Sequence, residues 1–458
     1  MSNTDTIYAL ASAPGRAGVA VLRVSGSHTA SVIEALTGML PVPRHAQLCR
    51  FTAPGSDEVI DAGLALWFPA PRSYTGEDMA ELQLHGSRAV LAAISSALSS
   101  LGCRLAEPGE FTRRAVVNGK LDLTAAEGVA DLVDAETQAQ RRQALRQLGG
   151  GLADTVSGWR ERLTKLEAHL VAAIDFADDD LPPDLLSSIR AGLEALRDDL
   201  KAALEGSRSA QRLRAGVYAA ILGAPNAGKS SLLNRLAQRD VAIVTPIAGT
   251  TRDVLEVDLE LGGYPLTLAD TAGLRESDDV VEQEGIRRAR ERAALADFKI
   301  LLIDAAAPDT GVLQHYAPGD LVVVNKTDIP VRHPSDMKVY PREGGGWDLA
   351  GPREDASFRW HDVSVKTNTG LSELIEALTR RTAELAGLTP APALTRARHR
   401  EVVEGTLIAL ERALRPGLNI DQLAEDVRLA SRTLGRLTGQ TGIEDLLDVV
   451  FRDFCLGK

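Results

Sequence analysis

A glycine-rich segment at residues 223–231 combines the residue types that bind phosphate. It reads G-A-P-N-A-G-K-S-S and fits the pattern G-x-x-x-x-G-K-[ST]. Its glycines let backbone N–H groups approach phosphate oxygens, while Lys229 brings a positive charge and Ser230 an oxygen ligand for Mg2+. We therefore expect a nucleoside triphosphate to contact Asn226, Ala227, Gly228, Lys229, Ser230 and Ser231.

Three further segments narrow the nucleotide to one that carries guanine. In N-K-T-D at residues 325–328, the Asp328 carboxylate can accept hydrogen bonds from N1–H and the exocyclic amine of guanine. D-T-A-G at residues 270–273 supplies an Asp for Mg2+ through water and a glycine N–H for the γ-phosphate, and S-V-K at residues 364–366 closes the base pocket. The residues predicted by these segments are Asp270, Thr271, Ala272, Gly273, Asn325, Lys326, Thr327, Asp328, Ser364, Val365 and Lys366.

The elements that must position these residues are strands of an α/β domain. Apolar runs at residues 217–222, 265–269 and 321–324 directly precede the polar segments, and the chain from Ser230 onward has the pattern of an amphipathic helix. This order predicts a P-loop GTPase domain. Residues 329–360 interrupt the pattern with three successive glycines and several prolines, so we expect a surface excursion there.

Composition indicates a folded protein of several domains. The chain has 458 residues, 44% hydrophobic and 25% charged, which predicts about three domains. A net charge of -12 argues against wholesale binding of nucleic acid, so any RNA contact must be local. Cys49, Cys103 and Cys455 show neither metal-ligand spacing nor an even pairing, and no secretory signal or membrane span is recognisable. We expect a reduced, cytoplasmic protein.

The segments around the nucleotide domain have different patterns. Residues 1–120 mix short strands and helices, which predicts an α+β N-terminal domain. Residues 121–214 and 387–458 both show apolar residues at helical spacing, whereas residues 215–386 form the G domain. We expect one helical domain into which the G domain is inserted.

Longer motifs resemble the MnmE (TrmE) family of tRNA modification GTPases over essentially the whole chain. They are T-P-I-A-G-T-T-R-D at 245–253, D-T-A-G-L at 270–274, the terminal F-C-L-G-K at 454–458, and the N-terminal stretches at 73–86 and 108–123. Departures from the family are small: Leu456 replaces the usual Ile, Val365 replaces the usual Ala, and the 329–360 excursion looks longer. None of them touches a phosphate or metal group.

For the G domain, the resemblance implies a Ras-like fold activated by potassium. Leu274 follows the D-T-A-G glycine, and an apolar side chain cannot orient the attacking water. The resemblance assigns that role to the catalytic acid Glu282, and Mg2+ to Ser230 and Thr251. It implies K+ ligands at Asn226, Thr245, Ile247 and Thr250, within a GTP-binding loop formed by Thr245, Pro246, Ile247, Ala248, Gly249, Thr250 and Thr251.

For the rest of the chain, the resemblance implies a folate-binding and dimerisation domain and a shared enzymatic task. The expected homodimer joins the FAD-dependent flavoprotein MnmG in a heterotetramer and acts on certain tRNAs. It adds a carboxymethylaminomethyl or aminomethyl group to carbon five of the wobble uridine. The one-carbon donor is a tetrahydrofolate derivative, in the 5-formyl or methylene form, and the implied contacts are Arg23, Glu81, Lys120 and Lys458, with Cys455 as nucleophile.

Other interpretations remain open for the function and for single residues. A ribosome-assembly GTPase or a regulatory switch would keep the nucleotide motifs but leave the N-terminal domain and the terminal Cys unexplained. Arg23 could be an edge charge of a strand, and Lys120 could lie in a solvated turn. A cluster at the start of a helix is the best local candidate for a tRNA backbone contact or else a solvated face: Arg396, Arg398, His399 and Arg400.

Overall fold

The computed structural model describes most of the chain as two compact units. The described residues are 5–175, 185–238, 256–270, 294–329, 339–341, 347–349, 360–387, 394–439, 447, 450, 451, 454 and 457. The first unit comprises Met1–Ala130, Arg146–Leu200 and Glu401–Lys458, and the second comprises Asp131–Leu145 and Lys201–Arg400. Among the helices of these described residues, none is long and apolar enough to cross a bilayer.

The first unit begins with a six-stranded sheet. Its strand order is β3-β4-β5-β2-β1-β6. Val32 and Ile33 of helix α1 (Thr29–Thr37) and Ile94 and Leu98 of helix α2 (Arg88–Ser100) form one core with Leu82 of the sheet. The strands are β1 (Ile7–Leu10), β2 (Ala17–Ser25), β3 (Gln47–Thr52), β4 (Val59–Phe68), β5 (Met79–Gly86) and β6 (Arg104–Leu105).

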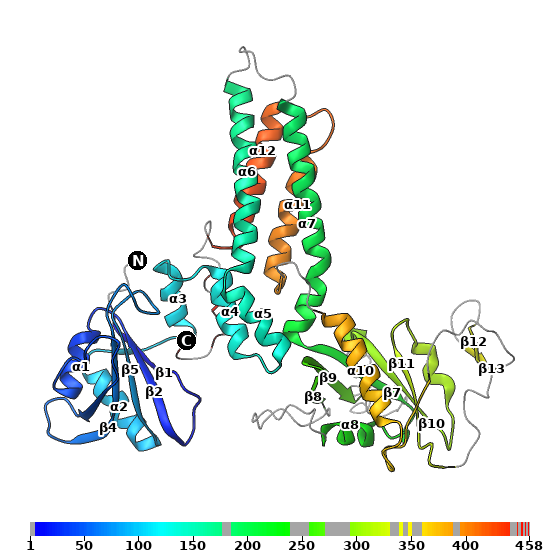
Figure 1. The fold of residues 1–458 in the computed structure, drawn as a ribbon, viewed down its shortest axis with the longest axis horizontal. Coiled ribbons are helices and arrows are strands. Elements are labelled where there is room, and N and C mark those ends of the chain that lie inside the picture. Colours follow the sequence, from blue (N-terminus) through cyan, green and yellow to red (C-terminus); the bar gives the residue numbers. More distant parts are fainter. Residues whose placement is uncertain are drawn as a thin grey trace, which may run out of the picture. The chain divides into compact units, whose positions relative to one another are not determined.

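Long helices complete the first unit and lie side by side in Figure 1. Ion pairs join them: Arg428 of α12 contacts Glu167 of α6 at 3.1 Å, and Arg412 of α11 contacts Asp426 of α12 at 2.7 Å. Helices α4, α5, α7 and α11 each continue from one unit into the other. The helices are α3 (Glu110–Val117), α4 (Leu123–Val133), α5 (Gln138–Leu148), α6 (Gly151–Asp175), α7 (Leu185–Ala215), α11 (Ala397–Ala413) and α12 (Ile420–Gly435).

The second unit contains a mainly parallel six-stranded sheet of order β14-β11-β10-β7-β9-β8. Only β8 runs antiparallel to its neighbour β9 among these described strands. Helices α8 (Lys229–Ala237) and α10 (Leu371–Ala386) pack on one face, and the 3-10 helix η1 (Thr310–His315) packs on the other. The strands are β7 (Val217–Gly223), β8 (Glu256–Leu261), β9 (Tyr264–Asp270), β10 (Phe298–Asp304), β11 (Leu321–Asn325) and β14 (Trp360–Asp362).

This topology brings the predicted chemistry to one edge of the sheet. The parallel strands β7, β9, β10 and β11 end at Gly223, Asp270, Asp304 and Asn325, and carboxyl ends of parallel strands are where open α/β sheets bind ligands. The predicted fold class is confirmed: an α+β N-terminal domain, helices, and a Ras-like P-loop domain. Within the 329–360 excursion, β12 (Val339–Pro341) and β13 (Trp347–Leu349) pair antiparallel.

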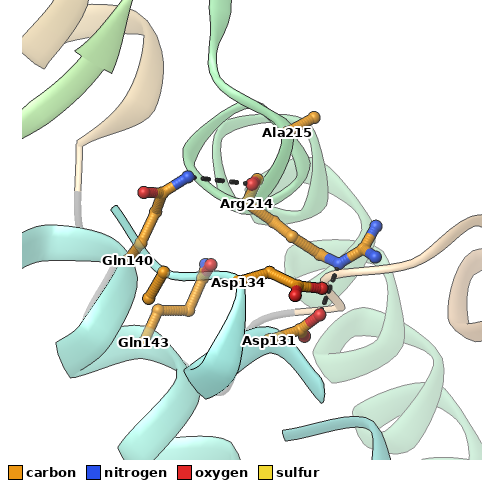
Figure 2. A pocket seen from close by; sticks show the side chains of 7 residues that line it. Asp131, Asp134, Gln140, Gln143, Arg214 and Ala215 are labelled. Atoms are coloured by element: carbon orange, nitrogen blue, oxygen red, sulfur yellow. Dashed lines mark hydrogen bonds and ion pairs between the residues drawn. The ribbon is translucent and has the colours of Figure 1, made fainter. Parts of the chain in front are cut away.

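A polar cavity of about 110 Å³ lies in the second unit where the chain enters and leaves the nucleotide domain. Figure 2 shows Asp131 facing Arg214, the penultimate residue of α7. The Asp131 carboxylate accepts a hydrogen bond from Arg214 Nε at 2.8 Å and another from Arg396 Nη2 at 2.6 Å. Because Arg214 precedes β7 and Arg396 precedes α11, one carboxylate joins the segments before these two elements.

Candidate functional site

The phosphate-binding loop joins β7 to α8 and is tied to the base-recognition motif. Gly228 has φ +97, and a Cβ there would lie 2.3 Å from Asn325 Nδ2, so only glycine fits. Asn325 Nδ2 donates a hydrogen bond to the Ala227 carbonyl oxygen at 2.9 Å. The two motifs, about a hundred residues apart in the chain, therefore form one structural site.

Lys229 is the buried cation of this loop. Lys229 is only 8% exposed. Its Nζ donates hydrogen bonds to the carbonyl oxygens of Gly223 at 2.9 Å and Ala224 at 3.1 Å. Burial lowers the pKa of the Lys229 ammonium group, and the nearby Asp270 carboxylate opposes that shift. Phosphate oxygens would supply the negative charge that this ammonium group favours.

The residues at the predicted magnesium position fit the ion's ligand preference. Ser230 Oγ donates a hydrogen bond to Asp270 Oδ2 at 2.5 Å, so the hydroxyl and carboxylate are adjacent. Asp270 is only 3% exposed, and its Oδ1 atom has no hydrogen-bond partner within the described part of the chain. A buried acceptor without a donor is costly, and hard oxygen ligands of this kind are what Mg2+ prefers. Ser230 and Asp270 are thus suited to hold Mg2+.

The predicted guanine pocket is assembled by hydrogen bonds between two loops. Ser364, fully buried, donates from Oγ to Asp328 Oδ1 at 2.7 Å. The Val365 N–H donates to Asn325 Oδ1 at 3.3 Å. These contacts fix the Asp328 carboxylate and the S-V-K segment relative to each other, which favours recognition of a base with two adjacent donors.

Asp304 belongs to this site, although the sequence analysis did not identify it. Its Oδ2 lies 2.6 Å from Lys326 Nζ, which also donates to the Asn226 carbonyl oxygen at 2.8 Å. Asp304 therefore positions the base-motif lysine, and the lysine in turn contacts the phosphate loop. Its signal in the sequence is an Asp that ends the apolar run at residues 298–304.

A second polar site lies on the N-terminal sheet. Arg23 of β2 lies opposite Glu81 of β5, and Arg23 Nε contacts Glu81 Oε1 at 2.9 Å. The guanidinium carbon of Arg23 also lies 5.7 Å from the centre of the Tyr74 ring. Tyr74 lies in a turn, and two residues after it a Cβ on Gly76 would lie 3.2 Å from Lys120 Cγ. The turn thus links Arg23 and Glu81 to Lys120, and Tyr74 is a member that the sequence analysis did not assign.

The end of the chain docks onto the N-terminal domain. Phe451 and Phe454 are 4% and 7% exposed, and both pack in a cluster with Val116 of α3. Gly457 has φ +88, and a Cβ there would lie 2.2 Å from the Leu10 carbonyl oxygen of β1. The two phenylalanines therefore dock the tail against the protein.

Several predicted site residues lie outside the described residues. They are Thr245, Pro246, Ile247, Ala248, Gly249, Thr250, Thr251, Thr271, Ala272, Gly273, Glu282, Cys455 and Lys458. The structure argues against two of the four residues in the candidate tRNA contact at residues 396–400. Arg396 is ion-paired with Asp131, and His399 is fully buried, so these two side chains turn into the protein.

Comparison with known proteins agrees with the motifs over the whole length. A family model described as GTP-binding protein TrmE N-terminus matches residues 6–120, and one described as MnmE helical domain matches residues 123–455. The tRNA modification GTPase MnmE of Paramagnetospirillum magneticum is 51% identical over 99% of this chain and 100% of that protein. The protein of the same name from Parvibaculum lavamentivorans is 49% identical over 99% and 100%.

Among solved structures, Aquifex aeolicus Era bound to GDP.AlF4- is 23% identical and covers 43% of this chain and 66% of that chain, with a TM-score of 0.27. The full-length relatives are much more similar, and both family models match the domains expected from the motifs. The chain belongs to the MnmE family of tRNA modification GTPases.

Proposed function

We propose that this GTPase acts with the flavoprotein MnmG on the wobble uridine of certain tRNAs in the cytoplasm. The pair adds a carboxymethylaminomethyl or aminomethyl group to carbon five, and a tetrahydrofolate derivative supplies the carbon. The protein acts as a homodimer within a heterotetramer that includes MnmG. Membership of the tRNA modification GTPase family supports the substrate class.

The observation that carries this proposal is the docking of the C-terminal tail. Gly457 lies against Leu10 of β1, and the neighbouring Ala9 of that strand is paired in register with Arg23 of β2. Arg23 forms the ion pair with Glu81 that we assign to folate binding. The docking therefore supports a role for the flanking Cys455 and Lys458 next to the folate.

The residues of this polar site suit a folate. Arg23 supplies a cation for a carboxylate or a ring carbonyl, Glu81 accepts hydrogen bonds from ring amines, and Lys120 provides a second cation. We assign Cys455 the role of nucleophile, since a thiolate attacks electrophilic carbon more readily than a hydroxyl group does. Bound folate would provide the transferable one-carbon unit.

Replacement of Cys455 by Ser tests this proposal with two assays on one variant. We expect Cys455→Ser to lose tRNA modification and to retain GTP hydrolysis, because the thiol belongs to a site separate from the nucleotide pocket. Leu456→Ile is the matched control and should retain both activities, since it changes only the shape of the adjacent side chain. Full modification by Cys455→Ser would remove the thiol from the mechanism.

A further inference from the structure

We propose that the exposed arginine face of α5, formed by Arg141 and Arg142, binds phosphates of the tRNA backbone. The inference rests on the proposed function, because it takes tRNA as the substrate. This face is a better candidate for the tRNA contact than the cluster at residues 396–400. In that cluster, Arg396 is ion-paired and His399 is buried.

The packing of α5 determines which of its faces is available. Ala139, Gln143 and Ala144 are buried, and Gln143 Nε2 donates to the Ala210 carbonyl oxygen of α7 at 3.1 Å. This contact holds the helix on α7 through one side. Arg141 and Arg142, which lie on the opposite side, are both exposed.

Among the residues that the structure describes, none neutralises the charge of this face. Helix α5 contains no Asp or Glu, although the whole chain carries a net charge of -12. Within the described part of the chain, no carboxylate pairs with Arg141 or Arg142, and Arg142 Nη2 donates instead to the neutral Gln138 Oε1 at 3.1 Å. By contrast, Arg212 and Arg214 of α7 are paired with Asp297 and Asp131.

The chemistry of the face favours RNA phosphate over a protein partner. Leu145 is the large apolar residue exposed on this helix, at 46%, which is too little apolar surface for a stable protein interface. Two adjacent guanidinium groups suit phosphate oxygens, which they can contact in a bidentate way. Asp134 and Glu136, which precede the helix and are exposed, would repel phosphate and so confine the contact to the part of α5 that begins at Arg141.

The test measures tRNA binding by the full-length protein over a series of KCl concentrations. We expect the double variant Arg141→Gln and Arg142→Gln to bind more weakly, and the slope of log K against log salt to fall by about two, roughly one for each phosphate that the variant no longer neutralises. Gln keeps the helix propensity of Arg, so GTP hydrolysis should not change. The double Lys variant should restore most of the slope, because it restores the charge.

The matched control is Arg197→Gln, an arginine of α7 that already pairs with Asp198 and should leave the slope unchanged. A Gln double variant with the slope and affinity of the unmodified protein would overturn the proposal. An equal weakening in the Gln and Lys double variants would also overturn it, because structural damage rather than charge would then be the cause. Failure of the unmodified protein to bind any tRNA would instead count against the proposed function.

Discussion

We propose that guanine selection in this protein depends on the carboxylate of Asp328. Ser364 donates a hydrogen bond of 2.7 Å to one of its oxygens, and a carboxylate offers acceptors for two base donors. We expect Asp328→Asn to weaken GTP binding by about 3 kcal/mol, because it exchanges a charged acceptor pair for an amide. Titration calorimetry with GTP and ATP measures both affinity and base preference.

Asp309→Asn is the control for this substitution. Asp309 caps the 3-10 helix η1 through the Gly311 N–H, and it is not among the residues of the guanine pocket. GTP affinity should therefore be unchanged in that variant. If Asp328→Asn also binds GTP as the unmodified protein does and keeps its preference over ATP, the guanine assignment is wrong.

Residues whose role follows from their own motif could be predicted, and residues recruited from elsewhere could not. Asn325 and Ser364 stand in motifs with a fixed chemical meaning. Asp304, by contrast, gains its role only because β10 lies beside β11 in the sheet and brings its last residue to Lys326. The pairing of Arg396 could not be predicted either, because its partner Asp131 is 265 residues away in the sequence.

At the scale of elements, a buried charge cluster holds α3 against the N-terminal sheet. Arg114 is 5% exposed and donates to the carboxylates of Glu110, Glu77 and Asp5. Burial acts to raise the pKa of the Glu110 carboxyl, but hydrogen bonds from Arg104 and Arg114 outweigh it and leave that pKa below its usual range. Burial also acts to raise the pKa of the Asp5 carboxyl, but the same two arginines outweigh it, so that this pKa too is below its usual value.

These shifts predict a dependence of stability on acidic pH. A carboxyl with a depressed folded-state pKa stabilises the fold above its unfolded pKa, about 4, and the stabilisation is lost as pH falls below that value. We expect Glu110→Gln to destabilise the protein by about 3 kcal/mol at pH 7, since it leaves Arg114 partly unpaired. Thermal unfolding should show the gap to the unmodified protein narrowing below about pH 4. A gap that stays constant with pH would contradict this account of the cluster.

The sequence predicted most elements because their apolar spacing is regular. Leu193, Leu196 and Leu200 are fully buried along α7, at the intervals of three and four that indicate a helix. The full length of β4 (Val59–Phe68) is not evident from its sequence, because Asp61 and Gly63 interrupt its apolar pattern. The pair β12 and β13 was not predicted, since three-residue strands have too few residues to show alternation.

At the scale of the whole molecule, we propose that the nucleotide domain uses a potassium ion to hydrolyse GTP. We propose that Asn226, with φ 65 in the phosphate loop, and the 245–250 loop hold K+, which supplies positive charge near the phosphates. Replacing K+ by Na+ should slow GTP turnover sharply. K+ should also promote GTP-dependent dimerisation, which sedimentation detects. Equal turnover in the two salts would exclude the potassium site.

The central claim is that this GTPase modifies the wobble uridine of tRNA. The most direct measurement is mass spectrometry of wobble uridine in tRNA from a strain that lacks the protein, with and without its gene supplied in trans. We predict loss of the carboxymethylaminomethyl or aminomethyl mass at carbon five, and its return with the intact gene. Unchanged wobble uridine in the strain without the protein would contradict the claim.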